Sequence, residues 1–148
     1  MTAPPSSHSP LVLAIDLGSS GVRVALVDAA GRVLSSGSGA VTMRLLPDGG
    51  AEEDPEEIWT AVEHSIRRAL AAAPGAHARI AAILCGSQYS SLVPVDAGGR
   101  PLGPLVLYLD TRGTRASLEL TSRQPEPWKP WLERHGLPSA GPGSDPRA

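Results

Sequence analysis

The stretch LAIDLGSSGVRVALVD, from Leu13 to Asp28, decides how the rest of this 148-residue chain is interpreted. Two apolar runs, residues 11–15 and 22–27, flank the sequence LGSSG. Continuous apolar runs are typical of strands buried on both faces, and Gly and Ser are turn formers. The pattern therefore predicts a hairpin of two buried strands. Asp16 ends the first run and Arg23 interrupts the second, and a purely structural hairpin gives no reason for charges there.

Composition excludes several classes of protein. The formal net charge of -2 gives no overall attraction to nucleic acid or to an anionic membrane. The single cysteine, Cys85, excludes an internal disulfide and a cysteine metal cluster. Residues 1–10 lack a basic start and an apolar core, so they do not resemble a signal peptide, and charges break the longest apolar region. We expect a cytoplasmic protein with no membrane or nucleic-acid partner.

The chain is expected to divide into three parts. Residues 1–9 are predicted to be a flexible tail, residues 10–122 a folded region, and residues 123–148 a Pro- and Gly-rich C-terminal segment. Within the folded region, residues 32–43 predict a third strand, more polar than the first two and therefore near an edge. Its sequence Ser36-Gly37-Ser38-Gly39 is interpreted as a flexible edge. The three strands should form an antiparallel meander.

A helix is predicted from Pro55 to about Ala73. Asp54 can cap it, Pro55 suits its first position, and Glu57 completes a capping box. Apolar residues then recur at helical spacing. Further strands are expected at residues 79–86 and 104–110, an extended piece at 91–96 and a helix within 111–122, which gives the order β-β-β-α-β-β. Trp59 is predicted to lie in the core and Cys85 to be a buried thiol.

The turn between the first two strands predicts a site for phosphate oxygens. Glycines permit tight backbone geometry, so that backbone N–H groups and two serine hydroxyls can point into one space. The residues concerned are Gly18, Ser19, Ser20 and Gly21. Asp16 can hold hydrated Mg²⁺ there, at the cost of partial desolvation beside a buried strand, and Arg23 adds positive charge. The alternative is a plain hairpin turn with a solvated aspartate.

At these residues the chain resembles a known superfamily. IDLGSSGVR is similar to the first phosphate motif of the actin-like, sugar-kinase and chaperone ATPases. Three later blocks resemble the FGGY carbohydrate kinases in the same order, up to about Gly113; they are ALVDAAGRVL, GGAEEDPEEIWTAV and CGSQYSSLVPVDAGGRPLGPLVLYLDTRG. The resemblance implies an α/β fold: an RNase H-like mixed sheet flanked by helices, present here as an incomplete N-terminal domain.

The resemblance also implies an activity and its residues. FGGY kinases transfer the γ-phosphate of ATP, with Mg²⁺, to a hydroxyl of a sugar or polyol. Asp16 matches the Mg-linked aspartate, which acts through water, and Arg23 matches the phosphate side. The positions that match the substrate side are Gln88, Tyr89, Ser90, Asp110 and Arg112. Xylulose kinases usually have Gln-Met-His and glycerol kinases Arg-Glu where this chain has Gln88-Tyr89-Ser90, so the sugar stays open.

The length of the chain limits what it can do alone. FGGY kinases are much longer, and their general base and adenosine site lie in parts that have no counterpart here. We therefore expect the N-terminal part of a kinase, inactive alone, whose partner could be a separate C-terminal half. One alternative is a non-catalytic sugar- or partner-binding module with the same fold. A nuclease is disfavoured, because its metals need several converging carboxylates and Asp16 alone ends a long buried strand.

Overall fold

The computed structural model describes residues 9–123 and 133–134. The chain divides into two compact units. The first unit comprises Met1–Thr42 and Asp54–Gln88, and the second comprises Met43–Glu53 and Tyr89–Ala148. Most of the predicted tail and nearly all of the predicted C-terminal segment lie outside the described residues.

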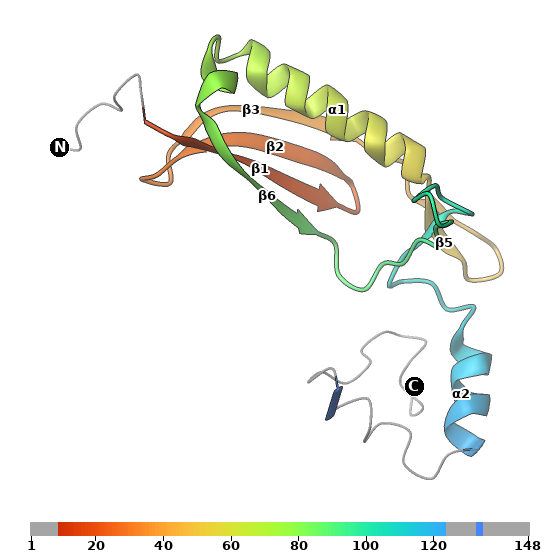
Figure 1. Cartoon of the computed structure of the whole chain (residues 1–148). Coiled ribbons are helices and arrows are strands. Elements are labelled where there is room, and N and C mark those ends of the chain that lie inside the picture. The colour runs from red at the N-terminus through yellow and green to blue at the C-terminus, as the bar shows by residue number, and fades with distance from the viewer. Residues whose placement is uncertain (1–8, 124–132, 135–148) are drawn as a thin grey trace. The chain divides into compact units, whose positions relative to one another are not determined.

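The first unit is built on a mixed sheet of four strands (Figure 1). Strands β1 (Leu11–Gly18), β2 (Gly21–Asp28) and β3 (Val33–Ala40) form an antiparallel meander. Strand β6 (Ile80–Ser87) lies parallel to β1 on the other side, so the order is β3-β2-β1-β6. The meander and the edge position of β3 are confirmed.

Helix α1 (Pro55–Ala71) packs on strands β2 and β3 of this sheet (Figure 1). It begins at the predicted residue, because the Asp54 carboxylate accepts a hydrogen bond of 2.9 Å from the backbone N–H of Glu56. The capping box predicted for Glu57 is wrong, because the Glu57 carboxylate instead accepts from the N–H and the hydroxyl of Thr42, at 3.1 and 2.8 Å. It ends two residues before the predicted Ala73, and a short 3-10 helix, η1 (Ala76–Arg79), leads into β6. The core between helix and sheet is mainly aliphatic; its largest fully buried apolar members are Leu11, Leu26, Val22 and Val24.

Glycines in β3 let α1 approach the sheet closely. A Cβ on Gly37 would lie 2.2 Å from the backbone oxygen of Ser65, and one on Gly39 would lie 3.0 Å from the Cβ of Ala61. The Ser35 hydroxyl donates a buried hydrogen bond of 2.7 Å to the Ala69 carbonyl. The stretch interpreted as a flexible edge is thus a packing surface for the helix.

The second unit contains a small sheet of three short strands. Strands β4 (Arg44–Leu45), β5 (Ala51–Glu53) and β7 (Leu105–Val106) pair in the order β4-β5-β7, and helix α2 (Thr114–Arg123) follows. The strand predicted at residues 104–110 is therefore only two residues long and belongs to this second sheet. Strands β4 and β5 were not predicted, because two or three residues carry no periodic pattern.

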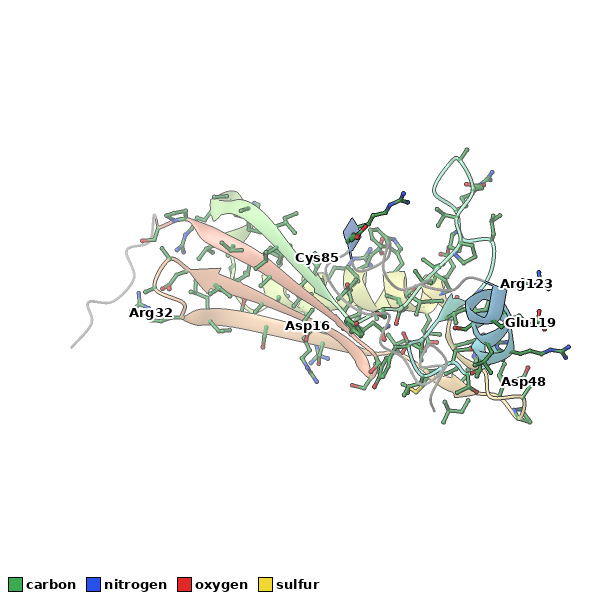
Figure 2. All side chains as sticks on the ribbon, turned by 90° about the horizontal axis from the view of Figure 1, so that it is seen from below. Asp16, Arg32, Asp48, Cys85, Glu119 and Arg123 are labelled. Atoms are coloured by element: carbon green, nitrogen blue, oxygen red, sulfur yellow. The ribbon has the colours of Figure 1, made fainter. Side chains whose placement is uncertain are left out.

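Three burial predictions are wrong. Trp59 is 61% exposed, because the buried side of α1 is formed by other residues. Cys85 is exposed on β6, one of the two edge strands of its sheet (Figure 2). In β1 only Leu11 and Leu13 are buried, and its other residues are half-buried or exposed, so the strand is not buried on both faces. In the described part of the chain, no helix has the length and apolar character needed to cross a membrane.

Candidate functional site

The turn between β1 and β2 is a tight two-residue hairpin. The two strands pair in register up to Gly18 and Gly21, which leaves Ser19 and Ser20 at the tip. Gly21 has a positive φ of 148°, and a Cβ there would lie 2.5 Å from the Gly39 carbonyl oxygen on β3. Glycine is therefore required at this position for both conformation and space. The predicted turn is present as a compact two-residue loop, and its role in binding phosphate stays a prediction.

Three polar residues form a row across the sheet beside this turn. Arg23 on β2 is the register partner of both Asp16 on β1 and Ser38 on β3. Directly paired residues point to the same face of a sheet, and here that face is opposite to the one that buries Val22 and Val24. Ser38 was missed by sequence reasoning. The only signal for it was the Ser–Gly alternation of β3, which becomes meaningful once the register is known.

Both charges in this row are accessible. Arg23 Nη1 lies 3.4 Å from Asp16 Oδ2, and the two side chains are 71% and 59% exposed. The contact is long and exposed, so it holds neither group firmly. The expected partial desolvation of Asp16 is wrong. Its side chain points to the open face of the sheet and is accessible to water. The carboxylate and the guanidinium are both available to a ligand.

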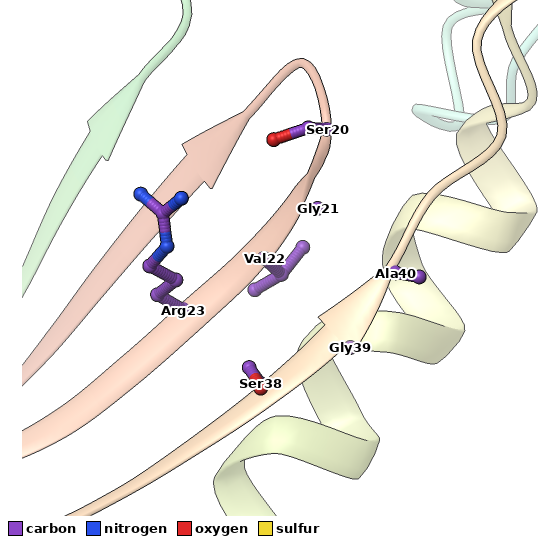
Figure 3. A pocket seen from close by; sticks show the side chains of 7 residues that line it. All are labelled: Ser20, Gly21, Val22, Arg23, Ser38, Gly39 and Ala40. Carbon is purple, nitrogen blue, oxygen red and sulfur yellow. The ribbon is translucent and has the colours of Figure 1, made fainter.

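A hollow of about 230 Å³ opens beside Arg23. Figure 3 shows that it lies between the first residues of β2 and the last residues of β3, with Ser20, Arg23 and Ser38 carrying its polar side chains. A guanidinium and two hydroxyls are donors suited to phosphate oxygens. The hollow therefore extends the donor set of the turn along the open face of the sheet.

The residues around Asp16 fit a hydrated magnesium ion bound together with a phosphate. No group of three or more His, Cys, Asp or Glu that could hold a metal exists among the described residues, so they form no all-protein metal cage. Mg²⁺ usually keeps several waters and binds through one or two carboxylates plus substrate phosphates. Asp16 has an accessible carboxylate of this kind, and the turn and Arg23 carry groups that can donate to phosphate oxygens.

The structure divides the predicted substrate residues between the two units. Gln88 belongs to the first unit, and its backbone N–H donates a hydrogen bond of 2.8 Å to the Leu17 carbonyl, which fixes it beside the end of β1. Tyr89 and Ser90 begin the next segment of the second unit. Tyr89 is 54% exposed, and Ser90 has a positive φ of 50°, unusual for a residue other than glycine.

Asp110 and Arg112, the remaining predicted substrate residues, form an ion-pair cluster with Glu52 in the second unit. Arg112 Nη2 donates to Asp110 Oδ2 and, at 2.6 Å, to Glu52 Oε1. Arg112 Nε donates to both oxygens of Asp110. Asp110 also accepts a hydrogen bond of 3.0 Å from the backbone N–H of Ala51. Glu52 was missed by sequence reasoning, because it lies 60 residues from Arg112 in the chain.

Asp110 and Arg112 stay ionised over a wide pH range. The hydrogen bonds from Arg112, joined by that from Ala51, lower the pKa of Asp110 from 3.8 to about 2 although the burial of the carboxyl opposes them. Asp110 and Glu52 together raise the pKa of Arg112. The second unit therefore holds an ionised Asp110–Arg112 pair at neutral pH.

The comparisons with known proteins agree with this arrangement of elements. The family model described as the FGGY family of carbohydrate kinases, N-terminal domain, matches residues 11–127. The chain belongs to the FGGY family. A xylulose kinase of Streptomyces coelicolor is 34% identical over 137 residues, covering 91% of this chain and 27% of the relative. A glycerol kinase of Brucella ovis is 36% identical over 127 residues, covering 85% of this chain and 25% of the relative.

Solved FGGY structures share the fold. A crystallised xyloylose kinase from Brucella ovis is 30% identical, with a TM-score of 0.75 over 90% of this chain and 27% of that one. The chain thus has the actin-like, RNase H-like α/β fold expected from the sequence. It spans about a quarter of the length of the curated relatives it matches.

Proposed function

We propose that this chain provides the phosphate-binding turn and part of the substrate site of a kinase that transfers phosphate from ATP to a sugar or polyol hydroxyl. The observation that carries the proposal is the hairpin of β1 and β2, whose turn lies next to Asp16 and Arg23. The family match over residues 11–127 supports it. The names of the relatives suggest xylulose and glycerol as the first substrates to test.

Different residues of the chain would position the phosphates, the magnesium ion and the acceptor substrate. The backbone N–H groups and hydroxyls of residues 19–21 would hold phosphate oxygens, and Arg23 would add a charge-assisted donor. Asp16 would orient a magnesium ion through water, and the bound ion would offset the negative charge that develops on the phosphates. Gln88, fixed beside the same strand end, would face the acceptor substrate.

We further propose that β6 binds the rest of such a kinase. Ile83 and Leu84 point to opposite faces of this strand and are 68% and 66% exposed. Within the described residues, β6 pairs only with β1, in parallel. Parallel strands are normally covered on both faces, so an exposed apolar strand of this kind favours a further strand and a covering layer. A polypeptide that completes the sheet is the partner that fits this chemistry.

Binding of MgATP to the isolated chain tests the proposal. Amide resonances of residues 18–21 should shift on addition of MgATP, and much less with ATP plus a chelator. Asp16→Asn should abolish the magnesium-dependent part of the shift. If MgATP leaves these resonances unchanged, the phosphate-binding role is wrong. Binding of D-xylulose or glycerol without any nucleotide binding would support a non-catalytic binding module instead.

A further inference from the structure

Asp110 has no capacity left for a substrate. Its side chain is 6% exposed, and its two oxygens accept from the backbone N–H groups of Ala51 and Arg112 and from the Arg112 guanidinium. A carboxylate that is buried and bonded in this way cannot exchange its donors for sugar hydroxyls without leaving them unpaired. The aspartate of the pair therefore positions the arginine and does not itself contact a ligand.

Arg112 and Glu52 do retain unused polar atoms. Arg112 engages the carboxylates through Nε and Nη2, and Glu52 accepts through Oε1. Within residues 9–123, Arg112 Nη1 and Glu52 Oε2 make no hydrogen bond. The two side chains are 33% and 18% exposed, so solvent or a ligand can reach them. The Arg112 guanidinium thus keeps Nη1 as an unused donor and the Glu52 carboxylate keeps Oε2 as an unused acceptor, while Nη2 and Oε1 join the two groups.

The backbone around this pair is shaped to hold it. A Cβ on Gly50 would lie 2.9 Å from Arg112 Cζ, so the guanidinium rests against bare backbone. Gly49 has a φ of 88°, and a Cβ there would lie 2.3 Å from the Thr111 hydroxyl oxygen. The Gly49 carbonyl also accepts a hydrogen bond of 3.0 Å from the Thr111 N–H. These contacts fix the segment that carries Glu52 against the segment that carries Arg112.

We propose that Glu52 and Arg112 together bind two adjacent hydroxyls of the acceptor substrate, with Asp110 as the positioning residue. A hydroxyl both donates and accepts, so one hydroxyl can accept from Arg112 Nη1 while its neighbour donates to Glu52 Oε2. The preformed ion pair keeps both groups oriented before the substrate arrives, which reduces the entropy lost on binding. The inference rests on the proposed function and narrows its substrate class to compounds with vicinal hydroxyls.

The test follows the Arg112 Nε–H signal by NMR in the isolated 148-residue chain. D-xylulose and glycerol should shift this signal, whereas 1,3-propanediol, which lacks adjacent hydroxyls, should not. Glu52→Gln should weaken polyol binding about tenfold, as expected for loss of one charge-assisted hydrogen bond. The Nε–H signal itself and the Ala51 amide should persist, because both are held by Asp110.

Glu119→Gln is the matched control. It breaks another Arg–Glu pair of the second unit, the exposed 3.1 Å contact of Arg115 and Glu119. Glu119 lies on α2 (Figure 2), and its replacement should leave polyol binding unchanged. Equal polyol affinity in Glu52→Gln and the natural chain would overturn the inference. So would polyol shifts elsewhere without a shift at Arg112, or no polyol binding at all. The MgATP response at residues 18–21 then reports separately whether the proposed function survives.

Discussion

Asp16 and Asp110 are both aspartates paired with a nearby arginine, yet one carboxylate is exposed and the other is buried. Asp16 is 59% exposed and touches Arg23 only at 3.4 Å. Asp110 is 6% exposed and accepts hydrogen bonds from two backbone N–H groups and a guanidinium. An exposed, weakly held carboxylate contributes little to folding and is free to bind a ligand, whereas a buried, saturated one contributes to folding and is not.

Replacing Asp16 should affect phosphoryl transfer and not folding. Asp16→Asn keeps the shape and removes an exposed charge, so the free energy of unfolding should change by less than about 0.5 kcal/mol. In a complete kinase that carries this chain, the transfer rate should fall about 100-fold, as when a key electrostatic group is lost. Arg23→Met should have a smaller effect. Thermal melts and turnover are measured on the same preparations of each variant. A lower melting temperature with full turnover in Asp16→Asn would refute the role of Asp16 in phosphoryl transfer.

The second unit should lose stability in acid through Asp110. The pKa of Asp110 is lowered from 3.8 to about 2 on folding, so its ionised form is favoured in the folded state. The resulting stabilisation is complete above the unfolded pKa and is lost as pH falls from about 4 to about 2. Comparing Asp110→Asn with the natural chain by denaturant unfolding across this range measures it. An Asp110→Asn variant with the same acid sensitivity as the natural chain would contradict the assignment.

At the scale of elements, the two units each contain a five-residue loop with the same sequence pattern and the same hydrogen bonds. Asp28-Ala29-Ala30-Gly31-Arg32 and Asp96-Ala97-Gly98-Gly99-Arg100 share the pattern D-A-x-G-R. In each loop the aspartate accepts from the backbone N–H groups two and four residues later and from the arginine Nε. Backbone hydrogen bonds from the arginine residue are the main reason that the pKa of each aspartate is lowered. The pattern is too short to register as a sequence repeat.

Glycine is needed in this loop for its backbone conformation alone. Gly31 has a φ of 78°, and a Cβ on this residue would meet no other atom within 4 Å, so space is not limiting. Gly31→Ala should lower the free energy of unfolding of the first unit by about 1 to 2 kcal/mol, because alanine is disfavoured at positive φ. Gly31→Asn should cost clearly less, since asparagine tolerates this conformation. Denaturant unfolding of both variants measures the two free energies of unfolding. Equal losses of free energy in Gly31→Ala and Gly31→Asn would argue against the conformational explanation.

Gly37 tests the contact between α1 and β3. A Cβ there would lie 2.2 Å from the Ser65 carbonyl oxygen, so Gly37→Ala must move the helix or the strand. Overpacking of this kind should lower the melting temperature and cost about 1 to 3 kcal/mol. Ser36→Ala, an exposed neighbour on the same strand, is the control and should change the free energy of unfolding by less than about 0.5 kcal/mol. A tolerated Gly37→Ala would mean that the helix does not need this close approach.

At the scale of the whole molecule, the chain by itself should not phosphorylate sugars. Phosphoryl transfer needs several groups to converge on the phosphate in a site that excludes water, and the Asp16 side of such a site is open to solvent. Purified chain with MgATP should therefore give no turnover on D-xylulose or glycerol. Robust turnover, with contaminating kinases excluded, would contradict this.

Turnover should require a partner that binds β6. Co-expression with the remaining part of the Streptomyces coelicolor xylulose kinase should yield a stable complex with this chain. Leu84→Asp, on the exposed strand, should prevent that association without unfolding the first unit. Size-exclusion chromatography of both variants distinguishes the outcomes. Association that is insensitive to Leu84→Asp would place the interface elsewhere.

Much of the first unit could be predicted because its signals are local. The Gly- and Ser-rich turn, the Asp54 cap and the apolar runs lie within a few residues of the structure they produce. The exposure of Trp59 and Cys85 could not be predicted, because a helix has two sides and a strand has two edges, and only the packing of other elements decides which are covered.

The sequence by itself determined the hairpin, the capped helix, the family and the candidate phosphate turn. Only the tertiary structure decided which polar residues meet. Strand register places Ser38 in line with Arg23 and Asp16, and folding brings Glu52 to Arg112 across 60 residues of chain. The physical reason is that turns, caps and periodicity are set by neighbouring residues, whereas cross-strand pairs and long-range ion pairs exist only after the chain has folded.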